Sequence, residues 1–240
     1  MDFNKLQYLP LALPHFSLLA GIFLVLVAWI EVRALRLAYT SVGLSPHVAL
    51  LLLLASLAGS YLNIPIAQLP ERHFVSGEEV PFFGMRYVIP VVIDWPGTII
   101  AVNVGGAVIP GLLSFYLFVK HRLWVQGVIA VLGVATVCHL LARPVPGVGI
   151  ALPVFVPPLS AAAIALLLSR WQSAALAYIG GSVGTLIGAD LLNLDKVPGL
   201  GAPVASIGGA GTFDGIFLTG ILAVLIASIF GRPRPSAAPS

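Results

Sequence analysis

Two aspartates, Asp190 and Asp214, are the residues of this sequence best suited to do chemistry. Each lies at the edge of an apolar segment and follows a run of small residues. A carboxylate in or beside a bilayer is costly, so by default it is either held by a partner or functional. Two carboxylates close together in a low-dielectric site share one proton, which yields one acid and one base. Such a pair suits the activation of a water for amide hydrolysis, and it suits proton-coupled transport equally well.

The composition predicts that these acids belong to a polytopic membrane protein. Hydrophobic residues make up 59% of the chain and charged residues only 9%, whereas soluble domains carry about a quarter charged residues. The mean hydropathy is +1.04. The net charge of +3 comes from loops and the tail and forms no basic stripe with interleaved aromatics, so no nucleic-acid partner is expected. The expected partners are the lipid bilayer and a membrane peptide or small-molecule substrate.

Apolar runs of about 20 residues, the length that crosses a bilayer, predict an all-α transmembrane helix bundle of about seven spans. The runs cover about residues 9–30, 46–67, 96–119, 123–141, 154–168, 173–192 and 212–230. Residues 71–95 are first polar and turn-rich and then β-prone, which predicts a short hairpin or re-entrant segment between spans two and three. We expect residues 1–231 to form a single transmembrane domain and the Pro/Ser-rich residues 232–240 to form a disordered tail.

Alternation of seven spans would bring most of the unusual residues to one membrane face. The longer, Gly- and Pro-rich connections 68–95, 142–153 and 193–211 fall on that face. It would carry Asp94, Asn103, Arg143, Asp190 and Asp214. Seven of the twelve Lys and Arg residues fall on the opposite face, so the positive-inside rule predicts a cytoplasmic C-terminus.

Five further residues on this face are candidates for substrate binding. Asn103 lies beside glycines inside the third expected span, where a broken helix can line a cavity, although it can also serve a simple kink. Arg143 can pair with Asp94 or a central acid, or anchor the chain at the interface. Glycines before Asp214 leave backbone N–H groups accessible. The predicted substrate-binding residues are Asn103, Arg143, Gly209, Gly211 and Asp94.

Glycines recur every four residues before the first acid, at Gly180, Gly184 and Gly188. In a bilayer such a stripe lets a second helix approach closely, so Asp190 is expected beside a tight helix contact. The single cysteine, Cys138, excludes an internal disulfide and a cysteine-based metal cluster. No His and acid spacing fits a metal site, and no nucleophile elbow, P-loop or Rossmann glycine pattern is present. No metal or cofactor is therefore expected.

Four phrases of the sequence resemble a known family. Residues 101–110, 144–150, 184–194 and 206–217 resemble a prokaryotic integral-membrane family known only as a domain of unknown function. The resemblance covers about residues 60–230 and implies an integral protein of the prokaryotic cytoplasmic membrane, without implying an activity.

A more distant similarity is to the presenilin and prepilin-peptidase type of intramembrane aspartyl protease. Those enzymes place one Asp near the end of a helix and another near the start of a following helix, after a Gly-x-Gly-Asp motif. Asp190 and Asp214 are similar to this plan, although the glycines here read Gly209-Ala-Gly-Thr-Phe-Asp214, which is two residues longer.

Three functions follow from these patterns. The first hypothesis is an intramembrane di-aspartate protein of protease-like design, with Asp190 and Asp214 as the acid/base pair around one water. The second is a proton- or cation-coupled transporter or permease that uses the same acids as ligands. The third is a non-catalytic membrane scaffold in which the acids only cap helices.

Overall fold

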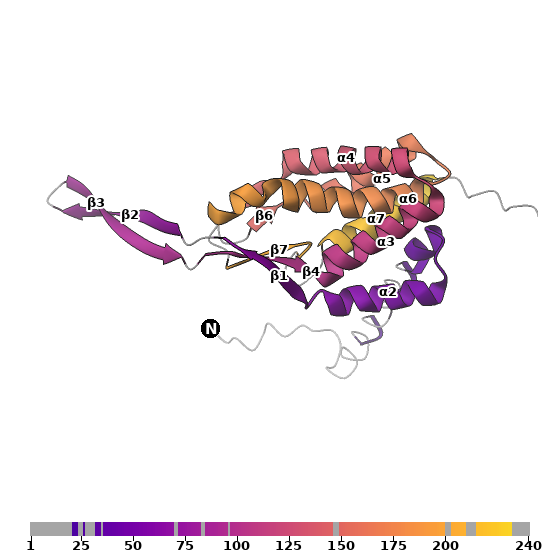
Figure 1. The fold of residues 1–240 in the computed structure, drawn as a ribbon, viewed down its shortest axis with the longest axis horizontal. Coiled ribbons are helices and arrows are strands. Elements are labelled where there is room, and N and C mark those ends of the chain that lie inside the picture. The colour runs from indigo at the N-terminus through magenta and orange to yellow at the C-terminus, as the bar shows by residue number, and fades with distance from the viewer. Residues whose placement is uncertain are drawn as a thin grey trace, which may run out of the picture.

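The computed structural model describes most of the chain as a bundle of helices with small sheets at one end (Figure 1). The described residues are 21–23, 26, 32–34, 36–69, 72–82, 85–95, 97–145, 149–199, 203–209 and 215–231. Most of the first expected span and the tail 232–240 lie outside them. The helices are Val32–Ser41, α2 (Pro46–Gly59), α3 (Ile109–His121), α4 (Trp124–Leu141), α5 (Val156–Leu168), α6 (Ser173–Ile179) and α7 (Gly215–Phe230).

Three helical stretches among the described residues are long and apolar enough to cross a membrane. They are Val104–His121, Trp124–Leu141 and Ser173–Val197, and the bent pair Val32–Ser41 and α2 adds a fourth if it counts as one span. The remaining apolar helices, α5 and Thr219–Phe230 within α7, are shorter. These lengths and compositions are compatible with a membrane protein, while the count of seven spans stays a prediction.

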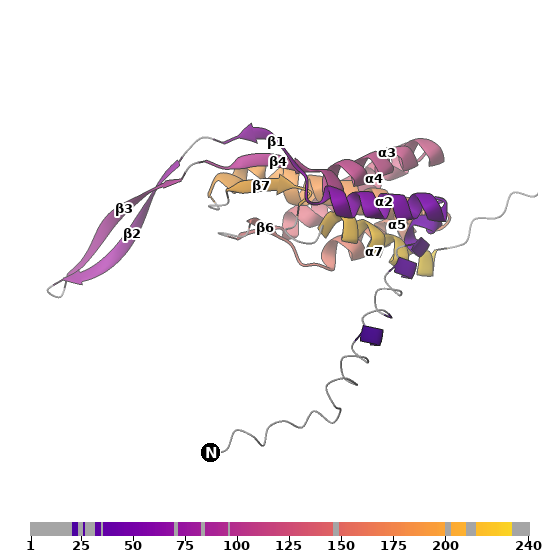
Figure 2. The same ribbon diagram turned by 90° about the horizontal axis from the view of Figure 1, so that it is seen from below.

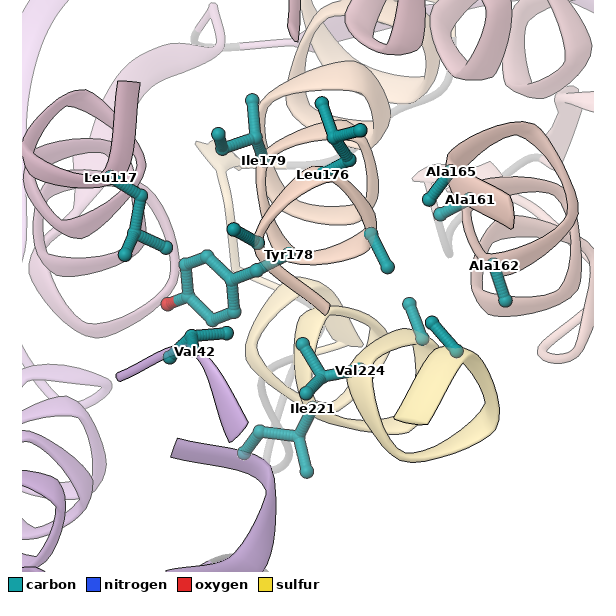
Figure 3. Close-up of a cluster of buried hydrophobic side chains, with 14 of the residues drawn as sticks. Val42, Leu117, Ala161, Ala162, Ala165, Leu176, Tyr178, Ile179, Ile221 and Val224 are labelled. Atoms are coloured by element: carbon teal, nitrogen blue, oxygen red, sulfur yellow. The ribbon is translucent and has the colours of Figure 1, made fainter. Parts of the chain in front are cut away.

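The stretch that begins with α6 is the centre of the bundle. Of its most apolar window 72% is buried, against 33% for each of the other two long stretches. It contacts α3, α4, α5 and α7. Figure 3 shows Leu176, Tyr178 and Ile179 of α6 among Leu117 of α3, the alanines of α5 and Val224 of α7. The first part of this stretch, which leads towards Asp190, is therefore held by several neighbouring helices.

The glycine stripe of this central stretch faces α4. A Cβ atom added at Gly184 would lie 2.7 Å from Cβ of Val134, and one added at Gly188 would lie 2.7 Å from Cα of Ala135. Carbon atoms in contact normally lie about 3.5–4.0 Å apart, so neither position has room for a side chain. The close helix contact predicted from the stripe is confirmed, and its partner is α4.

A three-stranded sheet replaces helix in parts of the second and third expected spans. Strand β4 (Ile99–Asn103) pairs antiparallel with β1 (Asn63–Gln68) and parallel with β7 (Val204–Ile207). Pro65 cannot continue a helix, and the β-branched residues of β4 favour a strand. The expected all-α architecture is thus corrected to a mostly helical one, in which strand pairing satisfies the backbone groups of three distant segments.

Two further antiparallel pairs lie at the same end of the bundle (Figures 1 and 2). Strands β2 (Arg72–Phe82) and β3 (Met85–Trp95), of 11 residues each, form a hairpin that projects away from the helices. Of the two forms expected for residues 71–95, the structure therefore has the hairpin. Strands β5 (Arg143–Val145) and β6 (Gly149–Ala151) form the second pair.

Candidate functional site

Asp190 is the last residue of the second of two wide π-type turns, Gly180–Gly184 and Leu186–Asp190, within the central helical stretch. Turns of this kind insert an extra residue into a helix and are frequent at functional sites. The N–H of Gly208 donates to Oδ2 of Asp190 across 2.7 Å. Gly208 follows β7 with φ of +83°, a conformation that glycine adopts without steric cost. The turn after β7 therefore presents a backbone donor to a half-buried carboxylate.

A fully buried side chain, Asn193, holds the turn that carries Asp190. Its Nδ2 donates to the backbone oxygens of Gly188 and Ala189, each across 2.9 Å. Nζ of Lys196 donates to its Oδ1 across 2.6 Å. Because an ammonium group only donates, this bond fixes Oδ1 towards Lys196 and Nδ2 towards the two carbonyls. Asn193 therefore bonds two carbonyls of the last π-type turn, where this turn gives way to the 3₁₀ stretch Leu191–Gly199.

Replacing Asn193 by alanine is expected to lower the free energy of unfolding by about 2–3 kcal/mol, because two buried carbonyls lose their donors. Unfolding of the purified protein in detergent micelles, followed by circular dichroism, measures this change. Asp195→Ala is the matched control, since Asp195 is exposed in the same 3₁₀ stretch, Leu191–Gly199. The control should change stability by less than about 0.5 kcal/mol. Equal effects of the two substitutions would contradict the role given to Asn193.

Asn103 hydrogen-bonds to two backbone groups and to the side chain of Asn63. It is 3% exposed and precedes the π-type turn Val104–Val108 that leads into α3. Its Oδ1 accepts from the N–H of Gly106 across 2.9 Å, and its Nδ2 donates to O of Ser60 and to Oδ1 of Asn63 across 2.8 and 3.1 Å. These bonds tie the start of α3 to the end of α2 and to β1.

A cavity of about 720 Å³ lies between these elements. Its wall is mostly apolar and comes from β6, β7, the start of α5 and the first turns of α7. Its polar residues include Ser60, Asn63, Asn103, Thr185, Asp190, Ser206 and Thr219. A largely apolar cavity of this size with a few convergent polar groups is typical of a ligand site. Among the described residues, no group of three or more His, Cys, Asp or Glu could hold a metal ion.

The structure brings only some of the predicted site residues together. Asp190, Asn103 and Gly209 line the cavity. Arg143 is exposed in β5 and does not belong to the described cavity wall. Asp94 lies in β3, opposite His73 in the strand register. Gly211 and Asp214 lie outside the described residues.

Three polar residues of the site escaped the sequence reasoning, namely Asn63, Ser206 and Asn193. Oγ of Ser206 donates to Oδ1 of Asn63 across 2.6 Å, and this contact forms only because β1 and β7 flank the same strand. Asn193 follows Asp190 by three residues, so a helix-end capping analysis of the acid's own segment would have found it. The two strand residues carry no comparable local signal.

These features define a mostly helical protein with a cavity at one end, in which the described residues include three helices long and apolar enough to span a membrane. Over residues 57–226 the sequence matches the family described as "Protein of unknown function (DUF1614)". The match spans more than half of the chain, and the chain belongs to this family. The predicted membership of an uncharacterised family is thus confirmed. No curated protein and no solved structure matches the chain.

Proposed function

We propose that the cavity is the centre of an intramembrane hydrolase of aspartyl-protease-like design, in which Asp190 and Asp214 act as the acid/base pair. The observation that carries this proposal is that Asp190 shares its cavity with Gly209 and Ile216. These two residues flank the segment that contains Asp214, and Ile216 follows Asp214 by only two residues. Asp214 lies outside the described residues, and its place in the pair rests on this connectivity.

The proposed reaction is hydrolysis of an amide bond by one water. The ionised carboxylate takes a proton from the water, whose oxygen adds to the carbonyl carbon, while the protonated carboxyl gives its proton to the carbonyl oxygen. The C–N bond then breaks, the nitrogen takes a proton, and a carboxylic acid and an amine are released. The apolar wall of the cavity excludes bulk water and suits a substrate with apolar side chains.

Proton- or cation-coupled transport is a second candidate, and the broken helices around the cavity favour it. Helix gives way to strand between α2 and β1, and strand gives way to helix between β4 and α3, while Asp190 is the last residue of the second π-type turn. Transporters commonly build their substrate sites from interrupted helices whose backbone lines a cavity. In this proposal Asp190 binds the coupling proton or cation. Both candidates place the protein in a bilayer, and its C-terminus in the cytoplasm stays a prediction.

Liposomes that contain the purified protein test both candidates with one pair of substitutions. Asp190→Asn and Asp214→Asn are each assayed for cleavage of an apolar helical peptide, by mass spectrometry, and for pH-driven uptake of the same peptide. For the hydrolase we expect cleavage to fall at least about 1,000-fold in either variant, as is usual on removal of a catalytic group. Asp195→Asn, which changes an exposed carboxylate of the same segment, should leave cleavage unchanged.

Each outcome separates the candidates. Uptake that depends on Asp190, together with no cleavage by the unsubstituted protein, would replace the hydrolase by the transporter. Neither activity in the unsubstituted protein, with normal folding of both variants, would favour the non-catalytic scaffold.

A further inference from the structure

The orientation of the Asn63 amide follows from a chain of hydrogen bonds that starts at the backbone. The N–H of Gly106 can only donate, and it lies 2.9 Å from the side chain of Asn103, so the atom it meets is Oδ1. The amide nitrogen of Asn103 therefore lies on the other branch. This nitrogen donates to the backbone oxygen of Ser60 across 2.8 Å and meets the side chain of Asn63 at 3.1 Å. The Asn63 atom that faces a donor must be its oxygen.

A second donor supports the same orientation. Oγ of Ser206 lies 2.6 Å from the same Asn63 oxygen. With two donors on Oδ1, the NH₂ group of Asn63 is turned away from both. Nδ2 makes no hydrogen bond within the part of the chain that the structure describes. Asn63 is exposed and lines the cavity, so its two N–H donors are available to a molecule that enters.

Hydrogen bonds from one short segment, Ser206 to Gly208, orient both the Asn63 amide and the Asp190 carboxylate. Ser206 contacts Asn63, and Gly208, two residues further, contacts Asp190. Two residues of extended chain span at most about 7 Å. Asn63 and Asp190 also line the same cavity, so one ligand in it can contact both the donors and the acid.

We infer that Asn63 is a ligand-binding residue whose NH₂ group donates to a neutral carbonyl oxygen of the amide or ester type. A donor pair requires an acceptor on the ligand. The nearby carboxylate of Asp190 disfavours an anionic acceptor such as a phosphate, because like charges in a low-dielectric site repel. The apolar wall selects apolar groups on either side of that carbonyl. The identity of this carbonyl as the bond that is cleaved rests on the proposed function, but the binding does not.

Binding of a defined probe tests the inference in protein that cannot use Asp190 for hydrolysis. Full-length Asp190→Asn protein in micelles, with ¹⁵N-labelled asparagine, is titrated with the apolar diamide acetyl-Leu-Leu-methylamide and separately with n-decane. The diamide should shift the side-chain NH₂ signals of Asn63 in a saturable way, and n-decane should not. Adding Asn63→Asp keeps an oxygen for Asn103 and Ser206 and removes the NH₂ donors, so the diamide should bind about fivefold more weakly, the equivalent of one neutral hydrogen bond.

Gln68→Glu is the charge-matched control, since it adds the same charge at an exposed position of the same strand. It should leave the dissociation constant unchanged. Equal affinity with and without Asn63→Asp, equal shifts with n-decane, or no binding of the diamide would each overturn the inference. Retained Asn63-dependent binding without cleavage of any peptide by the unsubstituted protein would remove the hydrolase proposal and leave this inference standing.

Discussion

Replacing Gly188 by alanine is expected to destabilise the protein by about 2 kcal/mol, although alanine favours an isolated helix by about 1 kcal/mol over glycine. The new Cβ would lie 2.7 Å from Cα of Ala135, and it would also clash with the backbone oxygen of that residue. A backbone cannot move aside as a flexible side chain does, so α4 and the central stretch must separate. Overpacking of this kind costs about 1–3 kcal/mol, and the upper end applies here.

Thermal unfolding in micelles measures this effect as a fall of about 4–8 °C in the midpoint. Gly111→Ala is the matched control, because Gly111 also lies in an apolar helix but a Cβ there would meet nothing within 4 Å. The control should be neutral or slightly stabilising. A fall in the midpoint for Gly111→Ala as large as that for Gly188→Ala would show that helix separation is not the cause.

The helices and one close contact between them could be predicted because their signals are local. An apolar run of sufficient length predicts a span, and glycines four residues apart predict a face on which another helix can approach. Asp190, next to that face, could be identified as a candidate site residue for the same reason. A carboxylate beside apolar residues is costly, and the local sequence alone shows that it lies there. None of these inferences needs the identity of the partner element, which the structure supplies as α4 for Gly188.

The sheet could not be predicted because its strands are short, apolar and far apart in the sequence. Residues Ile99–Asn103 have no polar alternation, so their pattern does not distinguish a strand from the first turns of a span. Their strand conformation depends on pairing with β1 and β7. The contacts of the candidate site share this origin, since Asn63 meets Asn103 across 40 residues and Ser206 across 143. Predictions made from one sequence segment at a time cannot detect hydrogen bonds between residues so far apart in the chain.

Gly208→Ala is expected to lower both the stability of the fold and the activity of the site. The substitution adds backbone strain, adds a steric clash and weakens a hydrogen bond. Its φ of +83° lies in a region that costs a residue with a side chain about 1–2 kcal/mol. A Cβ there would lie 2.7 Å from both Cβ and N of Ala107. Its N–H donates to Asp190, and a hydrogen bond to a charged group contributes about 1.5–3 kcal/mol. We therefore expect a loss of about 4 kcal/mol in the free energy of unfolding, the sum of backbone strain, clash and a weakened hydrogen bond.

The control variant Gly149→Ala introduces backbone strain without the steric clash and without the lost hydrogen bond to Asp190. Gly149 lines the same cavity with φ of +116°, but a Cβ there would meet nothing within 4 Å. This control should cost only the backbone strain, about 1–3 kcal/mol, and should leave the position of Asp190 unchanged. If the proposed hydrolysis is correct, cleavage should fall about 100-fold in Gly208→Ala, the usual effect of displacing a reacting group by about 1 Å, and much less in Gly149→Ala. Equal losses of stability and cleavage in the two variants would mean that the Gly208 N–H does not hold the carboxylate of Asp190 in place.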